Sequence, residues 1–287
     1  MPIANPVIVV PGITATNLDD QYPLPPETVW SVLWKDYERA ALHPDNLAYE
    51  AREPALVRAA KLFEVSYREL IEELRFNLRD REDQPVPVFP FSYDWRQPIE
   101  AAAQLLGTFI EEVIERTSLL RHYARDGYGE RRRVNLVGHS MGGLVIASYL
   151  DAFRGRARVD RVATLATPFR GSFEAVIKLT TGTANLGVTA PSSREREAAR
   201  VTPALYYLLP DVPETLEVAP GIPADLFDPE AWQPSVVATI AEFIRLHGLR
   251  PADRSTHSPG VVRRSLEGRP DWSQPAAIPG PWPTRVV

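Results

Sequence analysis

Residues 133–149, with the sequence RVNLVGHSMGGLVIASY, decide the fold of this chain. The apolar residues within 134–137 are typical of a short strand buried in a parallel sheet. From Leu144 onward, apolar residues recur at the spacing of a helix. Between them, residues 138–143 read GHSMGG, which matches the G-x-S-x-G turn that joins strand to helix in α/β hydrolases. The sequence therefore predicts an α/β-hydrolase fold with a mostly parallel sheet.

This turn predicts a catalytic role for Ser140. The fold places such a serine on a sharp, strained turn, so that its hydroxyl group stands clear of the sheet. Glycine at positions 138 and 142 avoids collisions that a side chain would cause there. The helix that begins at Met141 directs its free N–H groups toward a developing oxyanion. We therefore expect Ser140 to be the nucleophile and the Met141 N–H to be one oxyanion donor.

A second oxyanion donor is expected near the N-terminus. Residues 6–10 read PVIVV, which is typical of a buried strand, and Pro11-Gly12 ends that strand. In α/β hydrolases a loop after an early strand carries the second donor. The N–H of Ile13, or that of Thr14, is the candidate. The alternative is an ordinary turn after an ordinary strand.

Composition restricts the class of protein. The chain has 287 residues, enough for one large α/β domain, and its net charge of −5 argues against nucleic-acid binding. It has no cysteine, which excludes disulfides, thiolate metal sites and a cysteine nucleophile. No metal-binding or cofactor motif is visible, so we expect no cofactor. The N-terminus lacks the pattern of a signal peptide and no apolar run is long enough to span a membrane, which favours a cytoplasmic location.

The hydrolase domain is expected to cover residues 1–250, with cap-like excursions at about 17–65 and 180–234. Residues 251–287 are rich in proline and arginine and lack apolar periodicity, so we expect a disordered tail. A helix capped by Thr28 is expected to run through the apolar residues up to Tyr37, with Trp30 and Trp34, four residues apart, on one face.

Four further local patterns predict secondary structure. Ser66 and Glu69 match a capping box at the start of a helix that continues to residue 79. A long helix is expected over 99–117, with Leu105 among its inward residues. Residues 159–166 are expected to form a third buried strand, and the polar stretch 180–200 is expected to be a loop or lid.

Four motifs together resemble the lecithin:cholesterol acyltransferase family over roughly residues 5–250. They are VVPGI at 9–13, YDWR at 93–96, GHSMGG at 138–143 and ATPFRGS at 166–172. The YDWR element is the discriminating one, because the other motifs occur across many lipases.

The resemblance implies a serine acyl-enzyme acting on fatty acyl esters, which are hydrolysed or passed to an alcohol. Ser140 would be the nucleophile, and the N–H groups of Met141 and Ile13 would form the oxyanion hole. Asp94 and Arg96 are expected to brace loops by an ion pair rather than to take part in the chemistry. The expected partner is a lipid or acyl-ester substrate.

The histidine base is harder to find. A serine nucleophile of this fold needs a carboxylate and then a histidine later in the chain. Of five histidines, only His247 and His257 follow Ser140. His247 is expected near the end of a helix over 234–249. This leaves His257 as the candidate base, with Asp228 or Asp225 as the carboxylate, in a triad formed from residues of this chain's own C-terminal region.

A second interpretation of the C-terminal region is favoured. The family's Asp and His segments would lie beyond the end of this chain, and residues after about 250 would be unrelated sequence. The chain would then be a truncated or frame-shifted relative with an incomplete sheet edge, and it would bind lipid or a partner without turnover.

Overall fold

The computed structural model describes residues 3–31, 33–43, 50, 54–182, 193–211, 217–221, 223, 225–228 and 231–248. The tail expected over 251–287 lies outside these residues, as does 183–192 within the expected lid.

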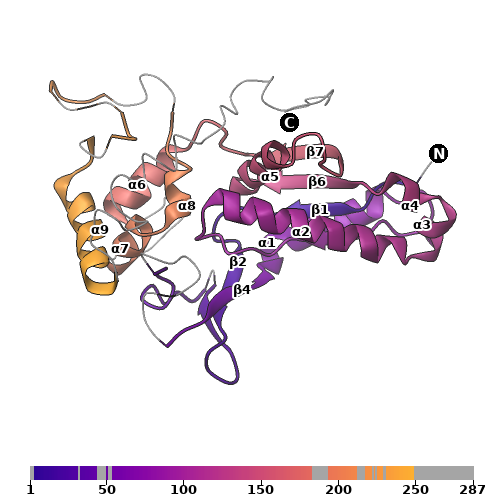
Figure 1. Ribbon diagram of the computed structural model, residues 1–287, viewed down its shortest axis with the longest axis horizontal. Coiled ribbons are helices and arrows are strands. Elements are labelled where there is room, and N and C mark those ends of the chain that lie inside the picture. The colour runs from indigo at the N-terminus through magenta and orange to yellow at the C-terminus, as the bar shows by residue number, and fades with distance from the viewer. Residues whose placement is uncertain are drawn as a thin grey trace.

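A parallel sheet forms the centre of the molecule (Figure 1). Its order is β5-β1-β6-β7, and each neighbouring pair is parallel, with Ile8 opposite Phe89 on one side and Leu136 on the other. The predicted α/β architecture with a mostly parallel sheet is confirmed. The strands are β1 (Val7–Val10), β5 (Val88–Pro90), β6 (Val134–His139) and β7 (Val159–Leu165).

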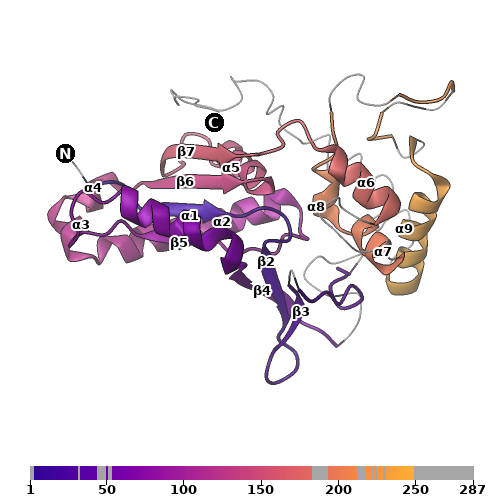
Figure 2. The same ribbon diagram turned by 180° about the vertical axis from the view of Figure 1, so that it is seen from behind.

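Helices cover both faces of this sheet. Ile8 and Val10 of β1 belong to one apolar cluster with residues of α2 (Ile99–Ser118) and α5 (Met141–Ala152). Val7 and Val9 belong to a second cluster with Tyr67 of α1 (Glu64–Asn77). Alternate side chains of β1 thus pack against different helix layers, as strand geometry requires. α2 covers the face of the sheet that is turned toward the viewer in Figure 1, and α1 covers the opposite face, which is turned toward the viewer in Figure 2.

Both helices predicted around the sheet exist, with two corrections. α1 begins at Glu64, and Phe63 at its cap position makes no side-chain capping bond, so the Ser66 capping box is wrong. The N–H of Phe63 donates instead to the carbonyl of Ala15 at 2.8 Å, which ties the start of the helix to the turn after β1. In α2, Leu105 is 56% exposed rather than inward.

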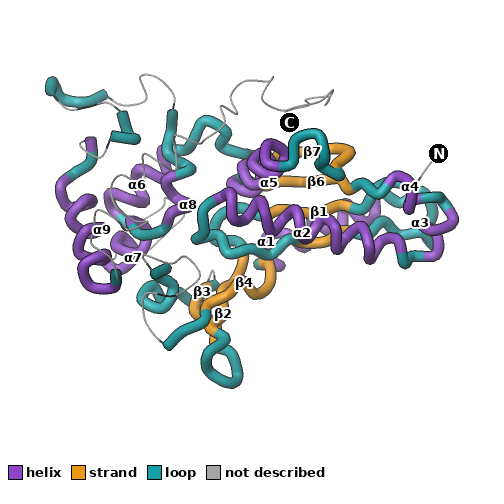
Figure 3. The backbone as a smooth tube through the Cα atoms, in the orientation of Figure 1, coloured by secondary structure: helices purple, strands orange, loops and turns teal. Residues whose placement is uncertain are grey.

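The excursion after β1 is a small antiparallel sheet of order β3-β2-β4, separate from the central sheet in Figure 3. Its strands are β2 (Thr16–Asp20), β3 (Glu27–Trp30) and β4 (Val57–Leu62). The helix predicted over 28–37 is therefore wrong. Trp30 packs against Trp95 with ring centroids 4.8 Å apart, whereas Trp34 is 63% exposed. The two tryptophans do not share a helical face, because Trp30 belongs to a strand that pairs with β2.

The strand β7 borders the central sheet. It pairs with β6, and among the described residues no further strand pairs with it. Asp160, Arg161 and Ala163 are exposed, so the strand exists as predicted but the prediction that it is buried is wrong. The reason is its border position, which leaves part of the strand uncovered.

Further helices gather beyond the carboxyl ends of the parallel strands (Figures 1 and 2). The loop predicted over 180–200 is wrong at Ser193–Arg200, which form helix α7. The helix predicted over 234–249 is confirmed as α9, Pro234–His247. No helix of the described residues is long and apolar enough to cross a membrane. The group consists of α6 (Phe173–Thr181), α7 (Ser193–Arg200), α8 (Pro203–Tyr206) and α9 (Pro234–His247), whereas α3 (Arg121–Arg125) and α4 (Tyr128–Arg131) lie at the other end of the sheet.

Candidate functional site

Ser140 stands alone between a strand and a helix. β6 ends at His139 and α5 begins at Met141. Ser140 has φ 52° and ψ −128°, a backbone conformation that is strained for any residue with a side chain. Its N–H donates to the carbonyl of Leu165 at 2.9 Å, which ties the turn to the end of β7. The predicted strand, tight turn and helix are therefore present.

The glycines around Ser140 allow the backbone to pack closely. A Cβ atom added to Gly142 would lie 2.1 Å from the carbonyl oxygen of Val10, and one on Gly138 would lie 2.8 Å from the Cα atom of Gly143. Real Cβ contacts are not this short, and the neighbours are backbone atoms that cannot turn aside. Only glycine fits at either position.

The turn after β1 lies beside Ser140. A Cβ atom on Gly12 would lie 2.9 Å from the Cβ and 3.3 Å from the Oγ atom of Ser140. Ile13, the candidate oxyanion donor, follows directly, and Thr14 adopts a left-handed φ of 63°. Within the part of the chain that the structure describes, no hydrogen-bond acceptor is found for the N–H of Ile13 or of Met141.

Two tyrosine hydroxyl groups contact the same turn. The Tyr67 oxygen accepts the N–H of Gly12 at 3.0 Å and lies 2.7 Å from Nδ1 of His139. The Tyr93 hydroxyl donates to the carbonyl of Pro11 at 2.9 Å. Burial lowers the pKa of His139, and burial raises the pKa of Tyr67 although the Gly12 N–H opposes that rise. No sequence pattern marks Tyr67 beyond its place in a helix, whereas Tyr93 opens the YDWR motif.

The YDWR motif forms a buried ion-pair network. Arg96 holds Asp94 through two hydrogen bonds and reaches Glu50 Oε2 through Nη1 at 2.9 Å. The same Nη1 donates to the carbonyl of Ala40 at 2.8 Å. Arg96 thus joins the segment before α2 to the excursion after β1. The prediction that Asp94 and Arg96 brace loops by an ion pair is confirmed.

Of the predicted acid–base residues, the structure describes the two aspartates. Asp225 and Asp228 lie in one turn before α9, where the Asp225 carboxylate accepts the N–H of Phe227 at 2.9 Å and its carbonyl accepts the N–H of Asp228 at 3.0 Å. His257 lies outside the described residues, so its pairing with either aspartate stays a prediction.

None of the described histidines is hydrogen-bonded to the Ser140 hydroxyl. His122 bonds to the carbonyl of Pro85, and His247 packs against the ring of Phe243. His139 directs its Nδ1 atom to Tyr67. The described residues also contain no group of three or more His, Asp or Glu side chains that could hold a metal ion.

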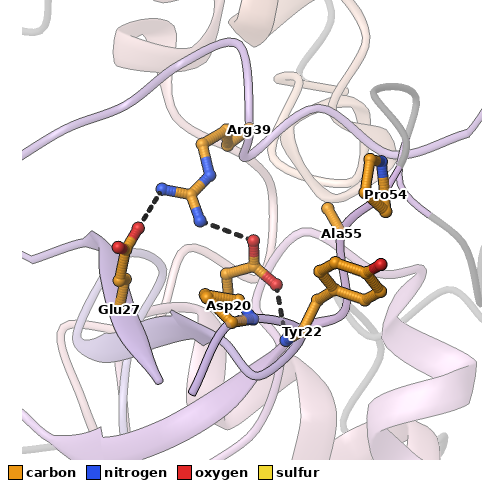
Figure 4. A pocket seen from close by; sticks show the side chains of 7 residues that line it. Asp20, Tyr22, Glu27, Arg39, Pro54 and Ala55 are labelled. Carbon is orange, nitrogen blue, oxygen red and sulfur yellow. Dashed lines mark hydrogen bonds and ion pairs between the residues drawn. The ribbon is translucent and has the colours of Figure 1, made fainter. Parts of the chain in front are cut away.

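A hollow of about 360 Å³ lies on the excursion rather than at Ser140 (Figure 4). Arg39 lies between the carboxylates of Asp20 and Glu27, at 2.5 and 2.8 Å. Asp20 also accepts the N–H of Tyr22 at 3.0 Å. Arg39 is paired with both carboxylates, and the residues that line the hollow all belong to the excursion, so the hollow is not part of the candidate site.

One known family matches the sequence of this chain. The model of the family described as lecithin:cholesterol acyltransferase matches residues 63–241. A comparison with curated proteins finds no match.

Two solved structures are similar to the chain. The structure of the Tle4–Tli4 complex is 18% identical, with a TM-score of 0.52 over 73% of this chain and 55% of the other. The mature form of the Bacillus licheniformis lipase BlEst2 is 17% identical, with a TM-score of 0.36 over 73% of this chain and 56% of the other. The chain thus spans little more than half the length of either structure.

Proposed function

This chain belongs to the lecithin:cholesterol acyltransferase family, and from that premise we propose that it acts on lipid-like acyl esters through an acyl-enzyme on Ser140. The acyl group is then passed to water or to an alcohol. The observation that carries the proposal is the backbone of Ser140, held at φ 52° between β6 and α5 and closed in by glycines. Strained backbone of this kind clusters at active sites.

The proposed reaction has two steps. The Ser140 oxygen attacks the carbonyl carbon of the ester, and the N–H groups of Met141 and Ile13 stabilise the oxyanion of the tetrahedral intermediate. Collapse of this intermediate releases the alcohol and leaves the acyl group on Ser140. Attack by water or by an acceptor alcohol then releases the acyl group and restores the Ser140 hydroxyl. A donor of this kind is worth about 3 kcal/mol of transition-state stabilisation.

The base in this proposal is His257, which takes the Ser140 proton and returns it to the leaving alcohol. Asp228, or Asp225 in its place, is the carboxylate that orients His257. The chain order serine, aspartate, histidine is the order of this fold.

A fluorophosphonate ester probe tests the nucleophile, because it reacts with a serine that a base activates. We expect stoichiometric labelling of the wild type and none of Ser140→Ala. Ser118→Ala is the matched control, because the Ser118 hydroxyl donates to the carbonyl of Ile114 within α2 and lies outside the candidate site. It should label like the wild type.

Two results would overturn the proposal. Labelling that persists in Ser140→Ala would place the reactive group elsewhere. A folded wild type that is not labelled would favour a relative that binds lipid or a partner without turnover.

A further inference from the structure

The peptide group between Pro11 and Gly12 is held at both of its polar atoms. Its carbonyl oxygen accepts the Tyr93 hydroxyl at 2.9 Å, and its N–H donates to the Tyr67 hydroxyl at 3.0 Å. Both tyrosines are buried, and they come from separate elements, Tyr67 from α1 and Tyr93 from the segment before α2. Two distant parts of the chain thus converge on one peptide group.

This restraint acts on the candidate oxyanion donor. A peptide group is planar, so fixing its C=O and its N–H fixes the orientation of the whole plane. The next N–H along the chain is that of Ile13. Between the two lies Gly12, a residue whose backbone is unusually free to rotate and whose lack of a side chain lets the turn approach Ser140. A turn built on glycine needs outside contacts to keep its next N–H in place, and the two hydroxyl groups supply them.

Tyr67 also connects this turn to the other side of Ser140. Its oxygen accepts the Gly12 N–H, which leaves its own proton free for Nδ1 of His139 at 2.7 Å. This arrangement requires a neutral His139 with its proton on Nε2. Burial lowers the pKa of His139 and so favours the neutral ring. His139 is bonded covalently to Ser140, so one hydroxyl group joins the turn and the serine.

We propose that Tyr67 and Tyr93 are positioning residues that hold the Ile13 N–H at the oxyanion hole, and that Tyr67 also fixes the turn relative to Ser140 through His139. This inference rests on the proposed function, because it assigns a role within the same reaction. Neither tyrosine touches the reacting atoms in it.

The test measures two parameters of fluorophosphonate labelling in each variant. These are the maximal rate and the probe concentration that gives half of that rate. Tyr67→Phe keeps the buried ring but leaves the Gly12 N–H and His139 Nδ1 without the hydroxyl. We expect its maximal rate to fall about tenfold, less than the loss of an oxyanion donor itself, with the half-saturating concentration nearly unchanged. Tyr93→Phe should act in the same direction. The double variant should lose less than the product of the two effects, because both hydroxyls hold one peptide group.

Tyr123→Phe is the matched control. Tyr123 is equally buried, and its hydroxyl donates to the carbonyl of Ala4 at 2.8 Å, before the start of β1. Its labelling rate should equal that of the wild type. The inference is overturned if Tyr67→Phe keeps the wild-type maximal rate, or if Tyr67→Phe and Tyr123→Phe reduce it equally.

A wild type that is not labelled would contradict the proposed function. A second measurement then tests the positioning of the turn independently of labelling. Nitrogen NMR should show His139 protonated on Nε2 in the wild type. Exchange of the Gly12 amide proton should be faster in Tyr67→Phe and unchanged in Tyr123→Phe. Equal Gly12 exchange in the wild type and Tyr67→Phe would overturn the restraint that the inference needs.

Discussion

Asp94 and Arg96 face each other in a two-point ion pair inside the molecule, with Nε to Oδ1 at 2.9 Å and Nη2 to Oδ2 at 2.7 Å. The Arg96 side chain is 1% exposed, and its remaining donor group binds Glu50 and the carbonyl of Ala40. A buried charge of this kind is tolerated because each donor has an acceptor. The network therefore fixes the excursion after β1 relative to the segment that carries Tyr93.

Replacing Arg96 by lysine should destabilise the protein strongly. A lysine cannot make the two-point contact with Asp94 and also reach Glu50, so two buried carboxylates lose donors. We expect the free energy of unfolding in urea to fall by about 3–5 kcal/mol. Arg116→Lys is the control, because its pair with Glu112 is exposed and should cost less than about 0.5 kcal/mol. Equal losses in the two variants would contradict the structural role of Arg96.

Acid should weaken the protein partly through Asp94. Burial alone would raise the pKa of this carboxyl, but the Arg96 guanidinium overrides it and holds the pKa below the ordinary 3.8. A lowered folded-state pKa gives stability that is present above the unfolded-state value and is lost as pH falls through the folded-state value. The free energy of unfolding should therefore begin to drop below about pH 5 and should continue to drop as the pH falls below the ordinary 3.8. Asp94→Asn should be less stable at neutral pH and should show a smaller drop, and an identical drop would exclude Asp94 as a source.

Gly142→Ala should disrupt the turn at Ser140. The added Cβ atom would lie 2.1 Å from the carbonyl oxygen of Val10, so β1 and α5 would have to move apart. We expect a loss of about 3 kcal/mol in the free energy of unfolding. Gly129→Ala is the control, because Gly129 lies in a helix with open space around its Cα atom. That change should be neutral or stabilising by up to about 1 kcal/mol, and a similar loss at both positions would rule out crowding as the cause.

Arg200 should stabilise the helices beyond the sheet. It is buried, and its donors bind the carbonyls of Leu179 at 2.9 Å and Ser235 at 2.9 Å and the hydroxyl of Thr239 at 2.7 Å. The last turn of α6 is the negative end of that helix, which favours a cation there. Arg200→Met should cost about 3 kcal/mol in urea unfolding, because it removes the charged hydrogen bonds from Arg200 to α6 and α9.

Arg154→Met is the control for Arg200→Met. Its pair with Asp151 is exposed, so the change should alter the free energy of unfolding by less than about 0.5 kcal/mol. If Arg200→Met proved equally mild, the hydrogen bonds of Arg200 would not hold α6, α7 and α9 together.

The sequence predicted those features that depend on neighbours along the chain. The turn at Ser140 was predictable because strand, glycine turn and helix lie within residues 133–149, and each glycine has a local steric reason. The long helix α2 was predictable from its apolar spacing, although Leu105 was assigned to the wrong face.

Features that depend on distant pairing were not predictable. Residues 27–30 became a strand because β2 pairs with them, and two tryptophans four apart gave a false helical pattern. The contact of Tyr67 with Gly12 joins positions 55 residues apart, and no local pattern marks it. The assignment of His257 and Asp228 rested on chain order alone, and the described residues do not test it.

The border strand β7 has a consequence for how copies of this chain meet. Among the described residues its outer side has no partner strand, and a bare strand edge is a template for adding a strand from another chain. Asp160 and Arg161 are adjacent on β7, both are exposed, and their side chains form an ion pair at 3.8 Å. The register with β6 shifts here, so Asp160 is an extra residue between Val159 and Arg161, as in a β-bulge. A strand that docked there would have to strip water from both charges. We infer that this pair protects the edge against aggregation.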